Sequence, residues 1–270
     1  MRLRAQSIRP AESAFTMIEI AISLAVIGIA LVAIIGVLPI GMNTQKDNRE
    51  ETIINQDATV LLETIRNGAR GVNDLTNYVY AITNSWITYA NHSPGAPQVN
   101  GYTYSSGSIA SGYPGFAVPI NNGTNIIGLL STPEFTNPGN GGPSDSQAIL
   151  NGNYISNHVV AYIRSLSGSA VEKPPQDNDI LRSDSFSYKV FLQNTPVAID
   201  TNNLSLYTTN LTANLHDLRL TFLWPLLPSG NTGAGRQTFR TLVAGQIIQA
   251  TNNNSLYYFQ PQTFTNIPAF

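Results

Sequence analysis

The 270-residue sequence contains no cysteine. That absence excludes disulfide bonds, thiolate metal ligands and thiol nucleophiles, although it leaves the redox compartment open. An excess of positive charge is lacking as well, because 14 lysines and arginines stand against 16 acidic residues, for a formal net charge of -2. Without a basic stripe to balance a phosphate backbone, the sequence predicts no nucleic-acid partner.

Proline and charge are scarce in different parts of the chain. No proline occurs between Pro39 and Pro94, whereas 14 of the 16 prolines lie at or beyond Pro94. Residues 1–74 carry 15 charged side chains, and residues 75–270 carry only 15 over more than twice the length. Because a proline in a helix interior costs about 3 kcal/mol, the pattern predicts a helical front and a back of strands and loops.

Charge is absent altogether from the apolar run Ile20–Met42. A helix of this length would measure about 35 Å, which is enough to cross a hydrocarbon core of about 30 Å. Residues 1–14 carry three arginines against one acid, which is typical of a basic leader that stays in the cytoplasm. A buried helix of a soluble protein is the alternative, but such helices are seldom apolar on every face over this length.

Helix-breaking residues stand near the far end of the apolar run, at Gly36, Pro39 and Gly41. They predict a kink or a weak point, because proline removes a helical hydrogen bond and glycine is a poor helix former. The helix is expected to resume over residues 44–67 and to stop at Gly68.

Apolar residues within 44–67 recur at helical spacing and form one stripe: Ile54, Ala58, Leu61, Leu62 and Ile65. We assign Asp57, Glu63 and Arg66 to the opposite, polar face of this amphipathic helix. The stripe requires a surface to cover, and the rest of the chain can supply one.

The back of the chain is rich in Asn, Thr, Ser, Gly and Tyr, and it shows apolar alternation in four segments, 157–166, 186–193, 214–224 and 238–248. The residues that share a side are Val160, Tyr162 and Leu166 in the first, Phe186, Tyr188, Val190 and Leu192 in the second, and Leu218, Leu220, Phe222 and Trp224 in the third. The last two segments predict an antiparallel hairpin with a glycine-rich tip at 230–235. Segments 93–115, 131–147 and 167–185 are expected to be surface loops.

Together these patterns predict an α+β protein in three parts. Residues 1–14 form the leader, residues 15–68 form a long helix whose first half spans a membrane at 20–42, and residues 69–270 form a head. The head is expected to be a β-rich antiparallel domain packed against the amphipathic half of the helix.

The order of the N-terminal features resembles a known family. A basic leader is followed by the small residue Ala14, by Phe-Thr-Met-Ile-Glu at residues 15–19, by about twenty apolar residues and by an amphipathic helix. This looks like the N-terminus of a type IV prepilin or a type II secretion pseudopilin, in which a glycine and a cleavage point precede Phe-Thr-Leu-Ile-Glu. Ala14 stands in place of the glycine and Met17 in place of the leucine, and the resemblance covers residues 1–67.

The resemblance implies processing and assembly. A prepilin peptidase would cut between Ala14 and Phe15 and methylate the new amine of Phe15, and the essential glutamate of the family corresponds to Glu19. An ionised acid beside an apolar run is costly, and pairing of Glu19 with the amine of a neighbouring subunit would offset that cost and set axial register. The alternative for Glu19 is an acid solvated by lipid headgroups. For Pro39, an incidental kink and a hinge that melts on assembly both fit.

The function implied is a non-enzymatic structural subunit of a type IV pilus-like or type II secretion filament. The head of about 200 residues is larger than that of a typical major pilin, which favours a minor pilin or minor pseudopilin near a filament tip. Implied partners are other subunits, the prepilin peptidase, the inner-membrane platform and its ATPase, and the lipid bilayer. The chain would cross the bacterial inner membrane once, with the head in the periplasm or, in a filament, at the cell surface.

Two further hypotheses come from other classes. An uncleaved single-pass protein could carry an adhesin or carbohydrate-binding head, for which the twelve tyrosines and two tryptophans would be suited. A membrane-tethered enzyme has no supporting motif, since no Gly-x-Ser-x-Gly elbow or coupled pair of carboxylates is evident.

No residue pattern predicts a cofactor or a bound metal. The three histidines His92, His158 and His216 lack the spacing of metal ligands. Asp177, Asp179 and Asp184 loosely resemble a calcium loop, and some pseudopilins bind calcium. The glycine and terminal glutamate of the twelve-residue calcium pattern are missing, however, so a solvated loop is favoured.

Overall fold

The computed structural model divides the chain into two compact units, Met1–Glu51 and Thr52–Phe270, and helix α1 (Met17–Arg66) contributes to both. The residues that the structure describes are 15–68, 73–103, 116–119, 122–139, 141–144, 146–167, 186–197, 206–250 and 256–264. An α+β protein with a long apolar N-terminal helix and an antiparallel sheet domain is therefore confirmed.

Helix α1 is continuous past Gly36, Pro39 and Gly41. The kink or weak point predicted at these residues does not interrupt the helix. Proline removes one intrahelical hydrogen bond but holds φ at a helical value, so the long helical flanks can continue on both sides of it. A local weak point at Pro39 stays a prediction.

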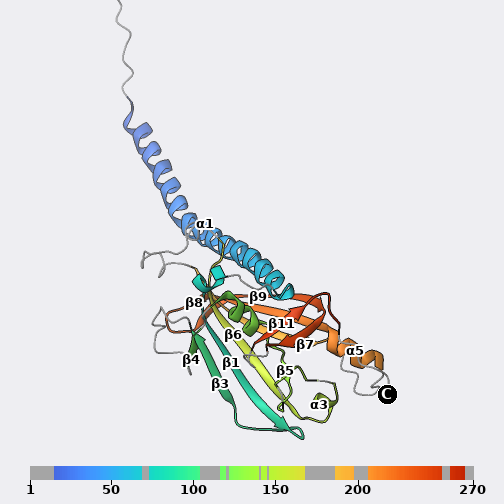
Figure 1. Ribbon diagram of the computed structural model, residues 1–270. Helices are drawn as coiled ribbons and strands as arrows, with labels where there is room; N and C mark the ends of the chain where they lie inside the picture. The colour runs from blue at the N-terminus through green and yellow to red at the C-terminus, as the bar shows by residue number, and fades with distance from the viewer. Residues whose placement is uncertain are drawn as a thin grey trace, which may run out of the picture. The chain divides into compact units, whose positions relative to one another are not determined.

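The second unit is built on a sheet in which neighbouring strands run in the order β4-β3-β1-β6-β7-β8-β9, with β2 paired to β1 and β5 paired to β6 (Figure 1). All of these pairs are antiparallel except β3 with β4. The strands are β1 (Val79–Ala90), β2 (Ser93–Pro94), β3 (Gln98–Thr103), β4 (Phe116–Pro119), β5 (Phe135–Thr136), β6 (Tyr154–Arg164), β7 (Ser187–Pro196), β8 (Leu215–Leu226) and β9 (Thr232–Ala244).

Short elements surround this sheet. A second, two-stranded antiparallel sheet is made by β10 (Gln246–Gln249) and β11 (Tyr257–Gln260). The remaining helices are η1 (Asn73–Asn77), α2 (Gly123–Leu130), α3 (Ser146–Leu150) and α5 (Leu206–Asn214). Helix α2 begins at an N-cap, where the side chain of Asn122 accepts a 2.8 Å hydrogen bond from the backbone N–H of Asn125.

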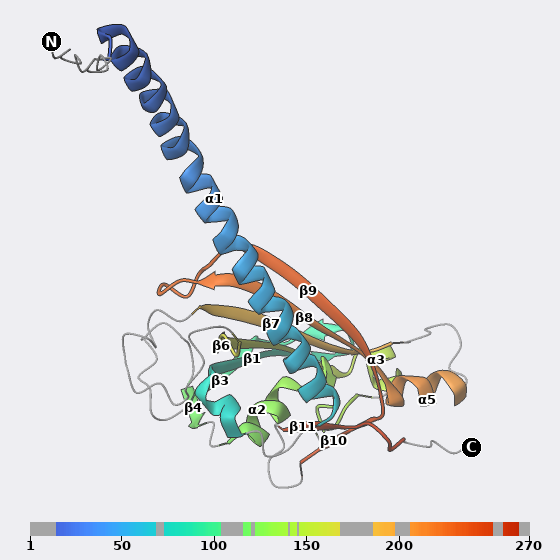
Figure 2. The same ribbon diagram turned by 90° about the horizontal axis from the view of Figure 1, so that it is seen from above.

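One face of the main sheet carries the hydrophobic core. Residues from Thr52 onward in α1, together with α2 and β11, pack with β1, β6, β7 and β8 in a single buried cluster (Figure 2). The predicted stripe of α1 is confirmed: four of its members are at most 1% exposed and Leu62 packs against the cluster at partial burial, the four being Ile54, Ala58, Leu61 and Ile65.

The predicted alternation is confirmed in β7 and β8. On β7 the buried side is formed by Tyr188, Val190 and Leu192, and on β8 it is formed by Leu218, Leu220, Phe222 and Trp224. In β6 the core side belongs instead to the odd residues Val159, Ala161 and Ile163. Both sides of β6 are apolar, so alternation alone did not identify the core side. Val160 and Tyr162 lie on the other face of the sheet, next to Phe191 and Lys189 of β7.

The predicted hairpin is the pair β8 and β9, but its tip is shorter than predicted. Leu226 already pairs with Thr232, so the predicted tip residues from Thr232 to Gly235 belong to β9. Gly235 pairs with Trp224, and a Cβ at residue 235 would lie 2.4 Å from the indole ring. Glycine there makes room for a large side chain and does not mark a turn.

Two of the predicted loops contain regular structure, and strand β1 was not predicted at all. Segment 93–115 contains β3, and segment 131–147 contains β5 and the start of α3. Strand β1 pairs with both β3 and β6, although its sequence VYAITNSWITYA alternates only weakly. All but the first residue of segment 167–185 lies outside the described residues.

Helix α1 ends as expected, just before Gly68. The backbone N–H of Gly68 donates a 3.0 Å hydrogen bond to the carbonyl of Ile65, and Gly68 has a φ of +54°. A Cβ at residue 68 would lie 2.2 Å from the carbonyl oxygen of Phe259 in β11. Glycine is thus required for conformation and for close approach of two backbones.

We expect Gly68→Ala to lower the free energy of unfolding of the full chain by roughly 2–4 kcal/mol, because it adds a clash to the cost of a positive φ. The matched control is Gly230→Ala, since Gly230 has a φ of +81° but no atom within 4 Å of the added Cβ. The control should cost about 1 kcal/mol, from backbone strain alone. Denaturant unfolding in detergent measures both, and equal losses would contradict the role of the Phe259 contact.

Candidate functional site

The first candidate site is the apolar part of α1. This is the one helix in the described part of the chain that is long and apolar enough to cross a membrane, and none of its most apolar stretch is buried. From Ile20 to Met42 the large apolar side chains remain 49% to 73% exposed. Complete burial of such a side chain is worth roughly 1.5–3 kcal/mol. Fourteen of them together make this segment unsuited to water and suited to lipid or to other apolar helices.

Glu19 takes part in a hydrogen-bonded cap at the start of α1. Its carboxylate accepts 2.8 Å hydrogen bonds from the backbone N–H and from the hydroxyl of Thr16, and the Thr16 hydroxyl accepts from the N–H of Glu19 at 3.4 Å. The sequence Thr-Met-Ile-Glu therefore forms a capping box, in which the N-cap threonine and the third helical residue satisfy each other. Both residues are exposed. This cap was not among the predictions, although the Ser/Thr-x-x-Glu spacing is its usual signal.

Some predicted site residues can be placed and others cannot. Phe15 directly precedes the capping threonine and is 82% exposed. Ala14 and the three calcium-loop candidates Asp177, Asp179 and Asp184 lie outside the described residues. Among the residues that are described, no group of three His, Asp or Glu side chains could hold a metal ion.

The three histidines lie in different surroundings. His92 has a positive φ of 63° after β1, and His158 is exposed on β6. His216 on β8 is only 3% exposed, with its ring 5.5 Å from that of Phe259. Burial lowers the pKa of His216 to about 4, so this side chain is neutral at neutral pH.

Asp57 is the residue whose prediction was wrong. It does not lie on the polar face of α1. It is 0% exposed and lies on the side of the helix that faces the sheet. Its Oδ2 accepts hydrogen bonds from the backbone N–H of Leu166 at 2.9 Å and from the hydroxyl of Tyr188 at 2.8 Å. Its Oδ1 accepts one from the hydroxyl of Ser167 at 2.6 Å. One carboxylate therefore joins the helix to the end of β6 and to β7.

The spacing of Asp57 could have revealed its burial. It lies three residues after Ile54 and four before Leu61, both of which belong to the stripe. Sequence reasoning followed the charge of the side chain and not its position on the helix. A buried carboxylate is stable when several donors serve it, and that condition depends on residues more than a hundred positions away.

The ionisation of Asp57 opposes folding. Burial raises its pKa, and the hydrogen bonds from Ser167, Leu166 and Tyr188 only partly counteract that effect. Because the folded pKa lies above the unfolded one, protonation favours the folded state. The stabilisation from protonation is complete below the ordinary carboxyl value and is lost as pH rises through the raised pKa.

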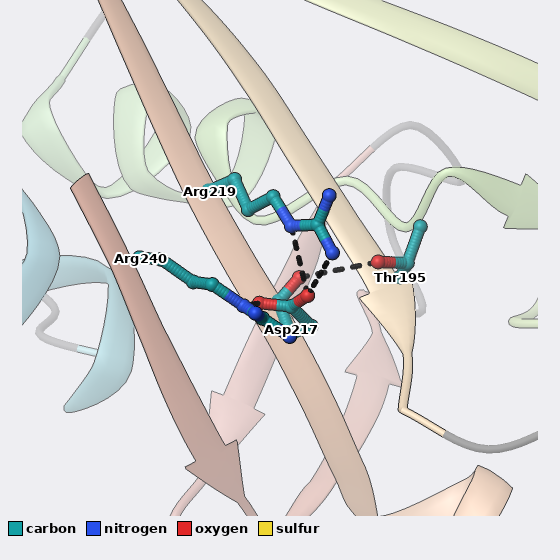
Figure 3. Close-up of polar contacts among 4 residues, drawn as sticks. All are labelled: Thr195, Asp217, Arg219 and Arg240. Carbon is teal, nitrogen blue, oxygen red and sulfur yellow. Dashed lines mark hydrogen bonds and ion pairs between the residues drawn. The ribbon is translucent and has the colours of Figure 1, made fainter. Parts of the chain in front are cut away.

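A second group of charges lies on the opposite face of the sheet (Figure 3). Asp217 on β8 is 3% exposed, and it contacts Arg219 of its own strand at 2.5 Å and Arg240 of β9 at 2.8 Å. Burial alone would raise the pKa of Asp217, but the hydrogen bonds and charges of Arg240 and Arg219 outweigh burial and lower it. Sequence reasoning missed this group because the approach of Arg240 depends on the register in which Arg219 pairs with Arg240.

Comparisons of the chain with protein-family models, with curated proteins and with solved structures found no match.

Asp57→Asn should leave stability at neutral pH within about 1 kcal/mol of wild type, since one amide oxygen can accept from Leu166 and Tyr188 while the amide NH₂ donates to Ser167. It should also remove the gain in stability that wild type shows as pH falls through the raised pKa of Asp57. Thermal unfolding of the full chain in detergent, from about pH 4 to pH 8, measures the difference between the two proteins at each pH.

The matched variant is Asp57→Ala, which leaves three donors, those of Leu166, Ser167 and Tyr188, without this acceptor. It should lower the free energy of unfolding by roughly 2–4 kcal/mol at neutral pH. Equal stability of the Ala and Asn variants would show that the three hydrogen bonds do not stabilise the contact between helix and sheet.

Proposed function

We propose that the protein is a structural subunit, a minor pilin or pseudopilin, of a type IV pilus-like or type II secretion filament. It would be inserted in the inner membrane through the apolar part of α1, with the head on the periplasmic side. A prepilin peptidase would cut between Ala14 and Phe15, and the membrane platform and ATPase would then transfer the subunit into the filament. No catalytic role belongs to this proposal.

The observation that carries the proposal is the uncovered apolar segment of α1 with Glu19 in its first turn. Fourteen large apolar side chains need an apolar environment, and either a bilayer or a bundle of like helices provides one. The same helix continues into the core of the head from Thr52 onward. A subunit that moves from membrane to filament requires both properties, because the segment that leaves the lipid must stay fixed to the head.

The capping box modifies the role proposed for Glu19. Two hydrogen bonds from Thr16 already serve the carboxylate within one chain, so the cost of its position beside apolar residues is partly offset without a neighbour. One carboxylate oxygen, Oε2, accepts both of these bonds. We propose that Oε1 receives the methylated amine of Phe15 from an adjacent subunit, which adds direction to a bundle whose apolar packing has none.

The first test examines the mature N-terminus. Intact-mass and peptide mass spectrometry of the protein purified from membranes of its native cells should find a chain that begins at N-methylated Phe15. A chain that retains Met1 would contradict the proposal and would favour an uncleaved single-pass anchor with an adhesive head. A prepilin peptidase deletion serves as control, because it should restore the full-length mass.

The second test separates charge from capping at Glu19. Glutamine also completes a capping box, so Glu19→Gln keeps the helix start but removes the anion. We expect it to reduce incorporation into filaments by at least about tenfold, which corresponds to about 1.4 kcal/mol per tenfold change. Thr16→Ala is the matched variant, since it removes the cap and keeps the charge, and it should retain most of the incorporation.

Pull-down of filaments with quantitative immunoblotting measures incorporation of both variants. If Glu19→Gln assembles as well as wild type, capping is the sufficient role of Glu19 and the proposed ion pair is wrong.

A further inference from the structure

Over β7, β8 and β9 the sheet face opposite the core carries side chains that are mostly exposed or half-buried among the residues that the structure describes. On β9 this face carries Arg236, Thr238, Arg240 and Leu242, all of them exposed. On β7 it carries Lys189, Phe191, Gln193 and Thr195, of which Phe191 and Gln193 are exposed. On β8 it carries Asp217, Arg219, Thr221 and Leu223. We call these twelve residues the open face.

Positive charge is concentrated on the open face. It carries four basic side chains, Lys189, Arg219, Arg236 and Arg240, against the single acid Asp217, whereas the whole chain has a net charge of -2. Arg219 and Arg240 form ion pairs with Asp217, yet their side chains are still 43% and 61% exposed. Within the described part of the chain, no carboxylate lies within ion-pair distance of Arg236 or Lys189. The twelve residues therefore carry an excess of three positive charges, which Glu134, whose carboxyl group interacts with Arg219, partly offsets at the edge of the face.

Strand pairing orders these residues into rows across the sheet. One row is Lys189, Leu223 and Arg236, the next is Phe191, Thr221 and Thr238, and the third is Gln193, Arg219 and Arg240. Rows on one face are separated by two residues, or about 6.6 Å along a strand. Two basic rows thus stand on either side of a row that offers an aromatic ring and two hydroxyls.

The middle row is polar and partly aromatic. The hydroxyls of Thr221 and Thr238 lie 3.0 Å apart, and either can donate or accept outward. The ring of Phe191 is 36% exposed, and the ammonium of Lys189 lies 5.1 Å from its centroid and 5.3 Å from that of Tyr162. An aromatic ring beside hydroxyls and an amide is suited to a ligand with both C–H faces and hydroxyl groups.

We propose that the open face binds an acidic polysaccharide, a glycan whose sugars carry carboxylates. Arg236 and Lys189 pair with carboxylates on one side of the glycan. The outward donors of Arg219 and Arg240 pair with carboxylates on its other side. Thr221, Thr238 and Gln193 bind sugar hydroxyls, and a sugar ring packs on Phe191. This binding does not depend on filament assembly.

The side chains favour a glycan over the other polyanions. Single-stranded nucleic acid is held by successive bases stacked on several aromatic rings. Among the twelve residues Phe191 is the only aromatic, and the neighbouring Tyr162 of β6 is only 8% exposed. Hydroxyl and amide side chains equal the basic ones in number on this face, Thr195, Gln193, Thr221 and Thr238 against four cations. Such groups match sugar hydroxyls better than they match phosphates or an anionic bilayer.

The test measures binding of the full chain held in phosphatidylcholine nanodiscs, which cover the apolar part of α1, carry no sugar headgroup and leave added vesicles intact. Immobilised polygalacturonate is the probe, and neutral dextran, an oligothymidylate and phosphatidylglycerol vesicles are the comparisons, all by biolayer interferometry. We expect binding to polygalacturonate that weakens with added salt, and none to dextran. The double variant Lys189→Gln, Arg236→Gln should weaken binding by about tenfold or more, and Phe191→Ala should weaken it as well.

The matched control is the double variant Lys46→Gln, Arg66→Gln, which removes the same charge from exposed positions of α1. It should bind like wild type, and Arg236→Lys should keep most of the affinity. Melting curves establish that every variant is folded. Absence of binding to polygalacturonate, tighter binding to the oligonucleotide or the vesicles, or an equal loss in the α1 control would each overturn the proposal. None of these results depends on whether the subunit enters a filament.

Discussion

The uncharged run from Ile20 to Met42 is the constraint on which the rest of the protein depends. Its apolar side chains are exposed over about 35 Å of helix α1, and no hydrophilic side chain interrupts them except Ser23, whose hydroxyl donates to the carbonyl of Glu19 at 2.6 Å. Such a segment is stable only in an apolar environment. The head is therefore folded onto one end of a helix whose other end requires lipid or other apolar helices around it.

Asp57 shows how the head holds that helix. Apolar stripes pack without a strong preference for one rotation, whereas a carboxylate that accepts from three directed donors allows only one. Burial of the charge is unfavourable in itself, as the raised pKa of Asp57 indicates. We infer that these directed bonds contribute to the specificity of helix placement, while the burial of the charge opposes folding, in contrast to Asp217, whose arginine partners lower its pKa.

The sequence was informative where one physical requirement dominates. The apolar run, the stripe on α1, the stop at Gly68 and the core sides of β7 and β8 all follow from local spacing. Prediction was poor where two requirements compete. Both sides of β6 are apolar, and Asp57 is polar but buried. Gly235 makes room for the ring of Trp224 and does not form a turn.

The two sites, the cap at the start of α1 and the open face, differ in how far apart their residues lie in the sequence. The cap at Thr16 and Glu19 lies within four residues and could have been predicted from its motif. The open face could not, because its charge arises from the register of β7, β8 and β9, while the composition of the whole chain is slightly acidic. The net charge of the whole chain argues against polyanion binding by the surface on average. It does not determine the charge of one face of a sheet.

The hydrogen bond between Tyr188 and Asp57 joins residues 131 positions apart, and this separation affects the order of events during synthesis. The ribosome completes α1 long before β7, so the stripe and its carboxylate are made well before the groups that cover them. Until then the new helix presents apolar surface that other chains can bind. Early anchoring of the nascent chain at a bilayer would limit such encounters, and a head synthesised without its anchor would have to fold through the most aggregation-prone interval unassisted.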